Sequence, residues 1–329
     1  MYTIFLQKST DRLCLKEGQL LHYSDDETVK RYPICATELI HVYGNAQITT
    51  QAVKECLKEG VRINYFNKYG CYLGRLEPGY PKNVRRRLSQ YRMFFDTERR
   101  LSAAKSLVES KIQGELIELR RLHEQGYRFP LKEFRTKLKY CRQKVKDCRS
   151  IGELLGIEGL SAKEYYNIFR YVLPPGIEWR GRSYHPAKDN FNVLLSCIYG
   201  MAAQVIREEI EKRSLDTACS FLHEPDYGRG GLSYDFLELF RALLCDNIAI
   251  RLLRRERSIQ EFIRAKTICR NVPEDIRYVA ERRFRKEVVC CHGVQKKTPC
   301  EQISEVVSIF IGSLDGRNDL DFSQILPER

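Results

Sequence analysis

The residues best suited to chemistry are one histidine and two acids on either side of a glycine-rich segment. His223 follows two apolar residues, and Asp235 and Glu238 lie beyond the glycines, in a segment with the apolar spacing of an amphipathic helix. Side chains three residues apart share one face of a helix, so both carboxylates can point the same way. Two carboxylates with a nearby imidazole are suited to bind Mg²⁺ or Mn²⁺ rather than a structural zinc ion.

The same residues also have an ordinary structural explanation. We expect the helix to begin at Ser233, whose hydroxyl can cap it. Asp235 and Glu238 would then lie in the first turns, where the helix dipole favours negative charge. His223 would be a packed histidine with no chemical role. These residues alone leave both explanations open.

A third acid, Glu158, lies between two glycines in residues 156–159. Ser161 and Glu164 have the spacing of a capping box, so we expect a helix to start at Ala162 and Glu158 to lie in the turn before it. A carboxylate in a turn can point outward, and loops often carry functional residues. A solvated turn acid is the alternative.

The basic residues are concentrated in one part of the chain. The net charge is +13, and residues 82–149 alone hold 20 Lys or Arg against 8 Asp or Glu. Such a basic surface is typical of proteins that bind a nucleic-acid backbone, whereas an ordinary solvated helix face carries both signs in similar number. We therefore favour DNA or RNA as a ligand.

A second basic segment interleaves cations with aromatic residues. Residues 179–188 contain Arg180, Arg182 and Lys188 together with tryptophan and tyrosine, which suits phosphate contact combined with base stacking. Ordinary loop packing explains the composition equally well. We add Arg229 and Arg241, which flank the acid pair, to the candidate DNA contacts.

Composition excludes several classes of protein. No apolar stretch approaches the length of a membrane span, and no signal peptide is recognisable, so we expect a cytoplasmic protein that does not enter a membrane. The 13 cysteines are scattered and odd in number, which indicates reduced thiols rather than disulfides. Cys290, Cys291, His292 and Cys300 lack the paired C-x-x-C spacing of a zinc site, so we assign no zinc there.

The elements that must position these residues fall into two predicted domains. Residues 1–80 read as short strands around one helix, which Thr49 or Thr50 can cap and Gly60 can end. This β-rich domain is expected to be structural or dimer-forming. Residues 77–81 are rich in glycine and proline and mark the boundary. Residues 81–329 read as mainly helical, including a long helix that begins near Asp189, so the predicted fold class is α+β.

Four separated motifs resemble a known family. They are Gly-Ile-Glu-Gly at 156–159, the helix start at 188–199, Phe-Leu-His-Glu at 221–224 with Tyr-Gly-Arg at 227–229, and residues 234–241. In this order they are similar to the CRISPR adaptation endonuclease/integrase family, the larger subunit of the complex that inserts new spacers into a repeat array. The resemblance covers about residues 1–265, although residues 124–150 carry none of its motifs.

The resemblance implies a sandwich-like N-terminal domain, a helical catalytic domain, and homodimers that assemble on a small ferredoxin-like CRISPR adaptation partner. It also implies Mn²⁺ or Mg²⁺ held by Glu158, His223 and Glu238, with Asp235 as a further acid beside them. Some relatives have aspartate at the position of Glu238, which keeps the ligand type.

The expected activity is metal-dependent cleavage and integration of DNA, in which a 3′-hydroxyl of the incoming spacer attacks a phosphodiester of the array. Two other functions stay open at this point. One is a structure-specific nuclease of DNA repair, and the other is a non-catalytic scaffold for double-stranded DNA.

Overall fold

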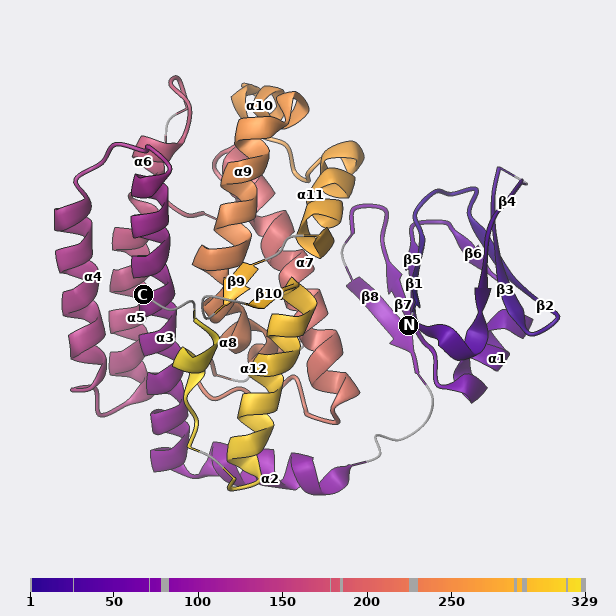
Figure 1. The fold of residues 1–329 in the computed structure, drawn as a ribbon, viewed down its shortest axis with the longest axis horizontal. Helices are drawn as coiled ribbons and strands as arrows, with labels where there is room; N and C mark the ends of the chain where they lie inside the picture. The colour runs from indigo at the N-terminus through magenta and orange to yellow at the C-terminus, as the bar shows by residue number, and fades with distance from the viewer. Residues whose placement is uncertain are drawn as a thin grey trace. The chain divides into compact units, whose positions relative to one another are not determined.

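The computed structural model describes residues 2–25, 27–70, 72–77, 83–177, 179–183, 186–224, 230–286, 289–291, 295–317 and 319–326 (Figure 1). It divides into two compact units, residues 1–81 and 82–329, within the segment where a boundary is predicted. Strands dominate the first unit and helices the second, so the predicted α+β class is confirmed.

The first unit contains two four-stranded sheets. In one sheet three parallel strands are followed by an antiparallel edge strand, in the order β1 (Tyr2–Leu6), β5 (Thr37–Tyr43), β7 (Arg62–Phe66) and β8 (Tyr72–Leu76). The other has the order β4 (Glu27–Pro33), β3 (Gln19–Ser24), β2 (Arg12–Lys16) and β6 (Gln47–Ile48). A short 3-10 turn, η1 (Ile34–Ala36), joins the two sheets.

The helix of the first unit, α1 (Thr50–Glu59), forms as its end residues predict. The Thr49 hydroxyl accepts the amide of Ala52 at 3.3 Å, and Gly60 ends the helix with φ of +84°. Glycine adopts this left-handed conformation without steric cost. Ala52 and Cys56 then pack into the core formed by the inward-facing residues of the two sheets.

The second unit is built mainly of helices. In chain order these are α2 (Val84–Phe95), α3 (Thr97–Glu124), α4 (Leu131–Val145), α5 (Ile151–Tyr166), α6 (Phe169–Val172), α7 (Asn190–Lys212), α8 (Gly231–Phe240), the π-helical turn η2 (Arg241–Asp246), α9 (Asn247–Arg255), α10 (Arg257–Arg264), α11 (Glu274–Lys286) and α12 (Pro299–Leu314). A two-stranded hairpin, β9 (Val289–Cys291) and β10 (Gln295–Lys297), precedes α12, and a 3-10 turn, η3 (Phe322–Ile325), follows it.

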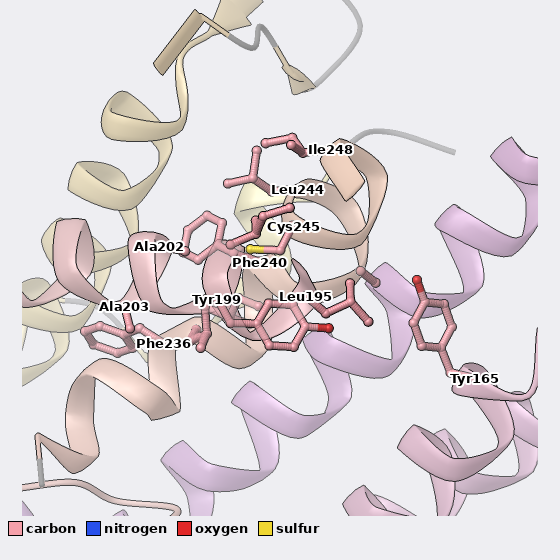
Figure 2. Close-up of a cluster of buried hydrophobic side chains, with 14 of the residues drawn as sticks. Tyr165, Leu195, Tyr199, Ala202, Ala203, Phe236, Phe240, Leu244, Cys245 and Ile248 are labelled. Carbon is pink, nitrogen blue, oxygen red and sulfur yellow. The ribbon is translucent and has the colours of Figure 1, made fainter. Parts of the chain in front are cut away.

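Helix α3 contacts α4 and α5 on one side and α8 and η2 on another (Figure 1). Because it is covered on several sides, it buries polar as well as apolar residues between Ala103 and Leu122. The core continues where α7 meets α8. Figure 2 shows Tyr199 and Ala203 of α7 close to Phe236 of α8 in this cluster.

Two predicted helix starts are wrong. Ser150, not Ser161, caps α5 by accepting the amide of Glu153 at 3.2 Å, so Glu158 lies inside a continuous helix rather than in a turn. Packing of α5 against α3 and α4 outweighs the low helix propensity of its glycines. Helix α8 likewise starts at Gly231, before Ser233, which is buried in its first turn.

Two other sequence-based expectations concern cysteines and membranes. The ten cysteines whose side chains the structure describes are free thiols, as their scatter predicts. The predicted absence of zinc at Cys290, Cys291 and His292 falls on side chains outside the described residues. Within the part of the chain that the structure describes, no helix has both the length and the hydropathy to cross a bilayer.

The glycines of α5 lead to a stability prediction. A Cβ added at Gly156 or Gly159 would meet no atom within 4 Å, and neither residue has a positive φ. Because alanine restricts the unfolded chain and favours helix, each Gly→Ala change should stabilise the protein by about 0.5–1 kcal/mol. Urea denaturation measures this directly. Gly60→Ala is the control, since its φ of +84° should make the same change destabilising. A destabilised Gly156→Ala protein would contradict the helical placement.

Candidate active site

Three helices of the second unit bring two of the predicted site residues onto one lysine. The ammonium of Lys111 on α3 lies 2.7 Å from Glu238 Oε2 on α8 and also contacts Glu158 Oε1 on α5. The side chains of Lys111 and Glu238 are 5% and 3% exposed, whereas that of Glu158 is 17% exposed. The predicted acids Glu158 and Glu238 therefore share one buried cation.

A second cation holds the other oxygen of Glu238. Arg241 Nη2 lies 2.9 Å from Glu238 Oε1, and its guanidinium also lies over the ring of Tyr199. Burial alone would raise the pKa of Glu238, but Arg241 and Lys111 outweigh it and lower that pKa to about 2. Burial would lower the pKa of Lys111, but Glu238 and Glu158 raise it above its usual value. Glu238 and Lys111 are consequently both charged at neutral pH.

The positions of Glu158 and Glu238 rule out the alternative that these acids only balance the positive dipole at the start of a helix. Helix α8 has no acid in its first turn, because it begins before Ser233 and Glu238 comes near its end. Glu158 lies in the middle of α5. The burial of Glu238 against two cations instead explains its position.

Asp235 fixes the segment that carries His223. Asp235 Oδ2 accepts the amides of Phe221 and Leu222 at 2.8 and 3.0 Å, and Oδ1 accepts the amide of His223 at 3.1 Å. Oδ1 also lies 2.7 Å from His223 Nδ1, which an ionised carboxylate makes the protonated nitrogen. Both oxygens are thus engaged, so the geometry favours Asp235 as the group that orients His223 over the predicted role of metal ligand.

The charges around His223 set its protonation. Burial alone would lower its pKa, but the hydrogen bond that His223 donates to Asp235 and the charges of Asp235, Glu238 and Glu158 together raise it above its usual value. The pKa of His223 therefore depends on the same two carboxylates that contact Lys111. Its Nε2 is left as the nitrogen that can accept a proton or bind a cation.

Glu115 is part of this cluster and is not among the predicted site residues. It lies one helical turn after Lys111 on α3 and is 2% exposed. Burial raises its pKa to about 8, partly opposed by the charge of Lys111, so at neutral pH it mostly carries a proton. The sequence could have indicated this burial only through position, because Lys111 and Glu115 lie among apolar residues whose spacing marks the buried face of the helix.

The donor set is suited to a hard divalent cation, although the side chains are not gathered around a vacant point. Among the described residues, no three His, Cys, Asp or Glu side chains lie together as a ready metal site. Glu158 and Glu238 already share one cation, and carboxylates with a neutral imidazole are donors that Mn²⁺ and Mg²⁺ accept. The residues therefore fit such an ion.

The predicted DNA contacts lie in different environments. Arg180 and Lys188 are exposed. Arg182 donates to Asn192 Oδ1 at 2.9 Å and Ser196 Oγ at 2.8 Å, which holds it against α7. Arg241 lies inside the cluster beside Glu238, and Arg229 is outside the described residues.

Tyr199 links this cluster to η2. Its hydroxyl donates to Asp246 Oδ1 at 2.5 Å and lies 2.8 Å from the hydroxyl of Tyr166. Guanidinium groups of Arg182 and Arg241 lie 5.2 and 4.9 Å from the centre of its ring. This buried network therefore contacts the same guanidinium that pairs with Glu238.

Solved structures share this fold. A CAS1 protein from Thermotoga maritima aligns with a TM-score of 0.77 at 21% identity, covering 97% of this chain and 99% of its own. A casposase bound to its integration product aligns with a TM-score of 0.78 at 24% identity, covering 100% and 95%. The chain therefore has the fold of Cas1 proteins and casposases.

Sequence comparison narrows this class to one family. A family profile described as CRISPR associated protein Cas1 matches residues 4–281. A CRISPR-associated endonuclease Cas1 of Thermus thermophilus is 31% identical over 251 residues, which are 75% of this chain and 73% of the relative. The chain belongs to the Cas1 family, which confirms the resemblance inferred from its motifs.

The link between Asp235 and His223 leads to a prediction for the metal-free protein. Asp235→Asn removes the negative charge that opposes the effect of burial on His223. The pKa of His223 should therefore be lower in this variant than in the wild type. Ring resonances of His223 in an NMR pH titration report this value. A histidine whose pKa is raised in the folded protein stabilises the fold at pH values below its unfolded-state pKa of about 6.5. This contribution is lost as the pH rises through its folded-state pKa.

The stability difference between wild type and Asp235→Asn should therefore be largest at acid pH and shrink as pH rises. Asp235→Glu is the control, because it keeps the charge. An unchanged His223 pKa in the Asn variant would show that the imidazole does not depend on this carboxylate.

Proposed function

We propose that this protein is a divalent-metal-dependent DNA endonuclease and integrase that inserts short DNA fragments into a CRISPR array. The observation that carries the proposal is the shared buried site of Glu158 and Glu238 beside an oriented His223. Membership of the Cas1 family and the structural likeness to a casposase that holds an integration product support it.

The reaction exchanges one phosphodiester for another. A 3′-hydroxyl oxygen of the incoming fragment forms a bond to phosphorus of the array strand, and the bond from that phosphorus to its former 3′-oxygen breaks. With water as the nucleophile the same site hydrolyses DNA. Because a diester is exchanged for a diester, integration needs no separate energy source.

Glu158, Glu238 and Nε2 of His223 would hold Mn²⁺ or Mg²⁺, which supplies positive charge to a phosphodiester when bound. The remaining steps belong to the protein. Asp235 holds the proton on Nδ1 and so keeps Nε2 available. Arg241 keeps Glu238 ionised and in place.

The partners follow from the same proposal. Double-stranded DNA would contact the basic surface of α3 and α4, and homodimers would assemble through the β-rich unit on a small ferredoxin-like partner. A repair nuclease would use the same chemistry without that partner, so co-purification of a small ferredoxin-like protein separates the two.

His223→Ala should abolish strand transfer while DNA binding survives. Loss of the imidazole removes one proposed ligand. Because changes to groups that only support metal ligands already reduce activity by about 10–100-fold, the loss here should be at least as large. Integration of a 3′-hydroxyl duplex into a supercoiled repeat plasmid with Mn²⁺ measures transfer, and fluorescence anisotropy measures binding. His123→Ala, on α3, is the matched control. Full strand transfer by the His223 variant would refute the site.

The basic surface should make binding depend on salt. Lys132, Arg135 and Lys139 are exposed and share one face of α4. Reversing all three charges to Glu should weaken duplex binding and flatten the plot of log K against log salt by about 0.9 for each phosphate that the variant no longer neutralises. Lys266→Glu gives a reference on another exposed segment. If the slope stays that of the wild type, DNA does not meet this face.

A further inference from the structure

Lys111 is buried at a position where an unpaired lysine would strongly destabilise the fold. Its neighbours on the same helix face, Leu107 and Val108, are fully buried, and its own side chain is 5% exposed. Burying an ammonium is costly unless it is paired. Its partners Glu158 and Glu238 come from two other helices, so the ion pairs of this lysine are with the two acids proposed to bind metal.

The charges of this cluster leave no place for a further cation. The ammonium of Lys111 and the guanidinium of Arg241 balance the two carboxylates. A divalent ion added beside them would leave two uncompensated positive charges in a buried region, which is strongly unfavourable. One oxygen of each carboxylate, Oε1 of Glu158 and Oε2 of Glu238, also already contacts Lys111.

We infer that Lys111 is a tethered counter-ion that a divalent cation must displace, and that it thereby makes the site select divalent over monovalent ions. This inference rests on the proposed metal site. It assigns Lys111 to ion specificity, a role separate from that of the residues that hold the ion.

The displaced ammonium has a destination on its own helix. Glu115 lies four residues after Lys111, a spacing at which side chains on a helix meet. It is buried, and its Oε2 has no hydrogen-bond partner among the residues that the structure describes. Lys111 can therefore move from Glu158 and Glu238 to Glu115 without leaving the protein interior, and Glu115 releases its proton to solvent as the ammonium arrives.

Selectivity follows from the competition. A monovalent ion carries the same charge as the ammonium, and the ammonium is held at high effective concentration by its side chain. Na⁺ or K⁺ therefore gains little from exchange. A divalent ion interacts with both carboxylates through twice the charge, so it can displace Lys111 where a monovalent ion cannot.

The test uses the full chain without DNA. Lys111→Met keeps much of the side-chain volume and removes the charge. Titration with Mn²⁺, followed by the EPR signal of the free ion, should show a dissociation constant at least about tenfold lower than that of the wild type. K⁺ should raise the melting temperature of the variant and not that of the wild type. Lys111→Arg, which keeps the charge, should retain the selectivity.

The destination is tested separately. Glu115→Gln should weaken Mn²⁺ binding, because the displaced ammonium then lacks an anion. Wild-type crystals grown with and without Mn²⁺ should show Lys111 Nζ moved from Glu158 and Glu238 to Glu115. This comparison decides the matter if Lys111→Met does not fold, and an ammonium that stays between both carboxylates with the ion bound overturns the inference.

The outcomes also separate this inference from the proposed function. If folded Lys111→Met binds Mn²⁺ no more tightly while wild-type binding is lost in Glu158→Gln, Lys111 has no role in selectivity and the metal site stands. If the wild type binds no Mn²⁺ and transfers no strand, both fall together.

Discussion

The contact between Lys111 and two carboxylates holds three helices of the second unit in register. A buried ammonium without partners would be intolerable, so α5 and α8 must present Glu158 and Glu238 to α3 at hydrogen-bonding distance. Burial of apolar side chains is non-directional, whereas this contact requires two carboxylates to meet one ammonium. The electrostatic requirement of one lysine therefore keeps acids that are far apart in the sequence beside each other.

Helix α8 adds a second level of organisation. Its first half carries Asp235, which accepts the three consecutive amides of residues 221–223, and its second half carries Glu238. One rigid element thus sets both the orientation of the imidazole and the position of a carboxylate. Because the two tasks share a helix, α8 sets where the imidazole and the Glu238 carboxylate lie relative to each other.

Local signals in the sequence predict those features that depend on local interactions. Thr49 and Gly60 bound α1, and Asp189 caps α7, as their residue types indicate. The helix containing Glu158 is not predictable in this way, because tertiary packing overrides its glycines. Lys111 and Glu115 are hidden for a related reason. In a segment rich in lysine and arginine, only their phase relative to the apolar residues distinguishes buried charges from surface charges.

The π-helical turn η2 has a geometric consequence for the network around Tyr199. Residues five apart on an ordinary α-helix point roughly 140° away from each other, whereas i→i+5 hydrogen bonding stacks them on one side. Arg241 and Asp246 are five apart, and both reach Tyr199, one over its ring and one at its hydroxyl. If the same six residues were wound as an α-helix, one of the two would turn away from Tyr199. The winding of this turn, as much as its composition, decides which groups can meet.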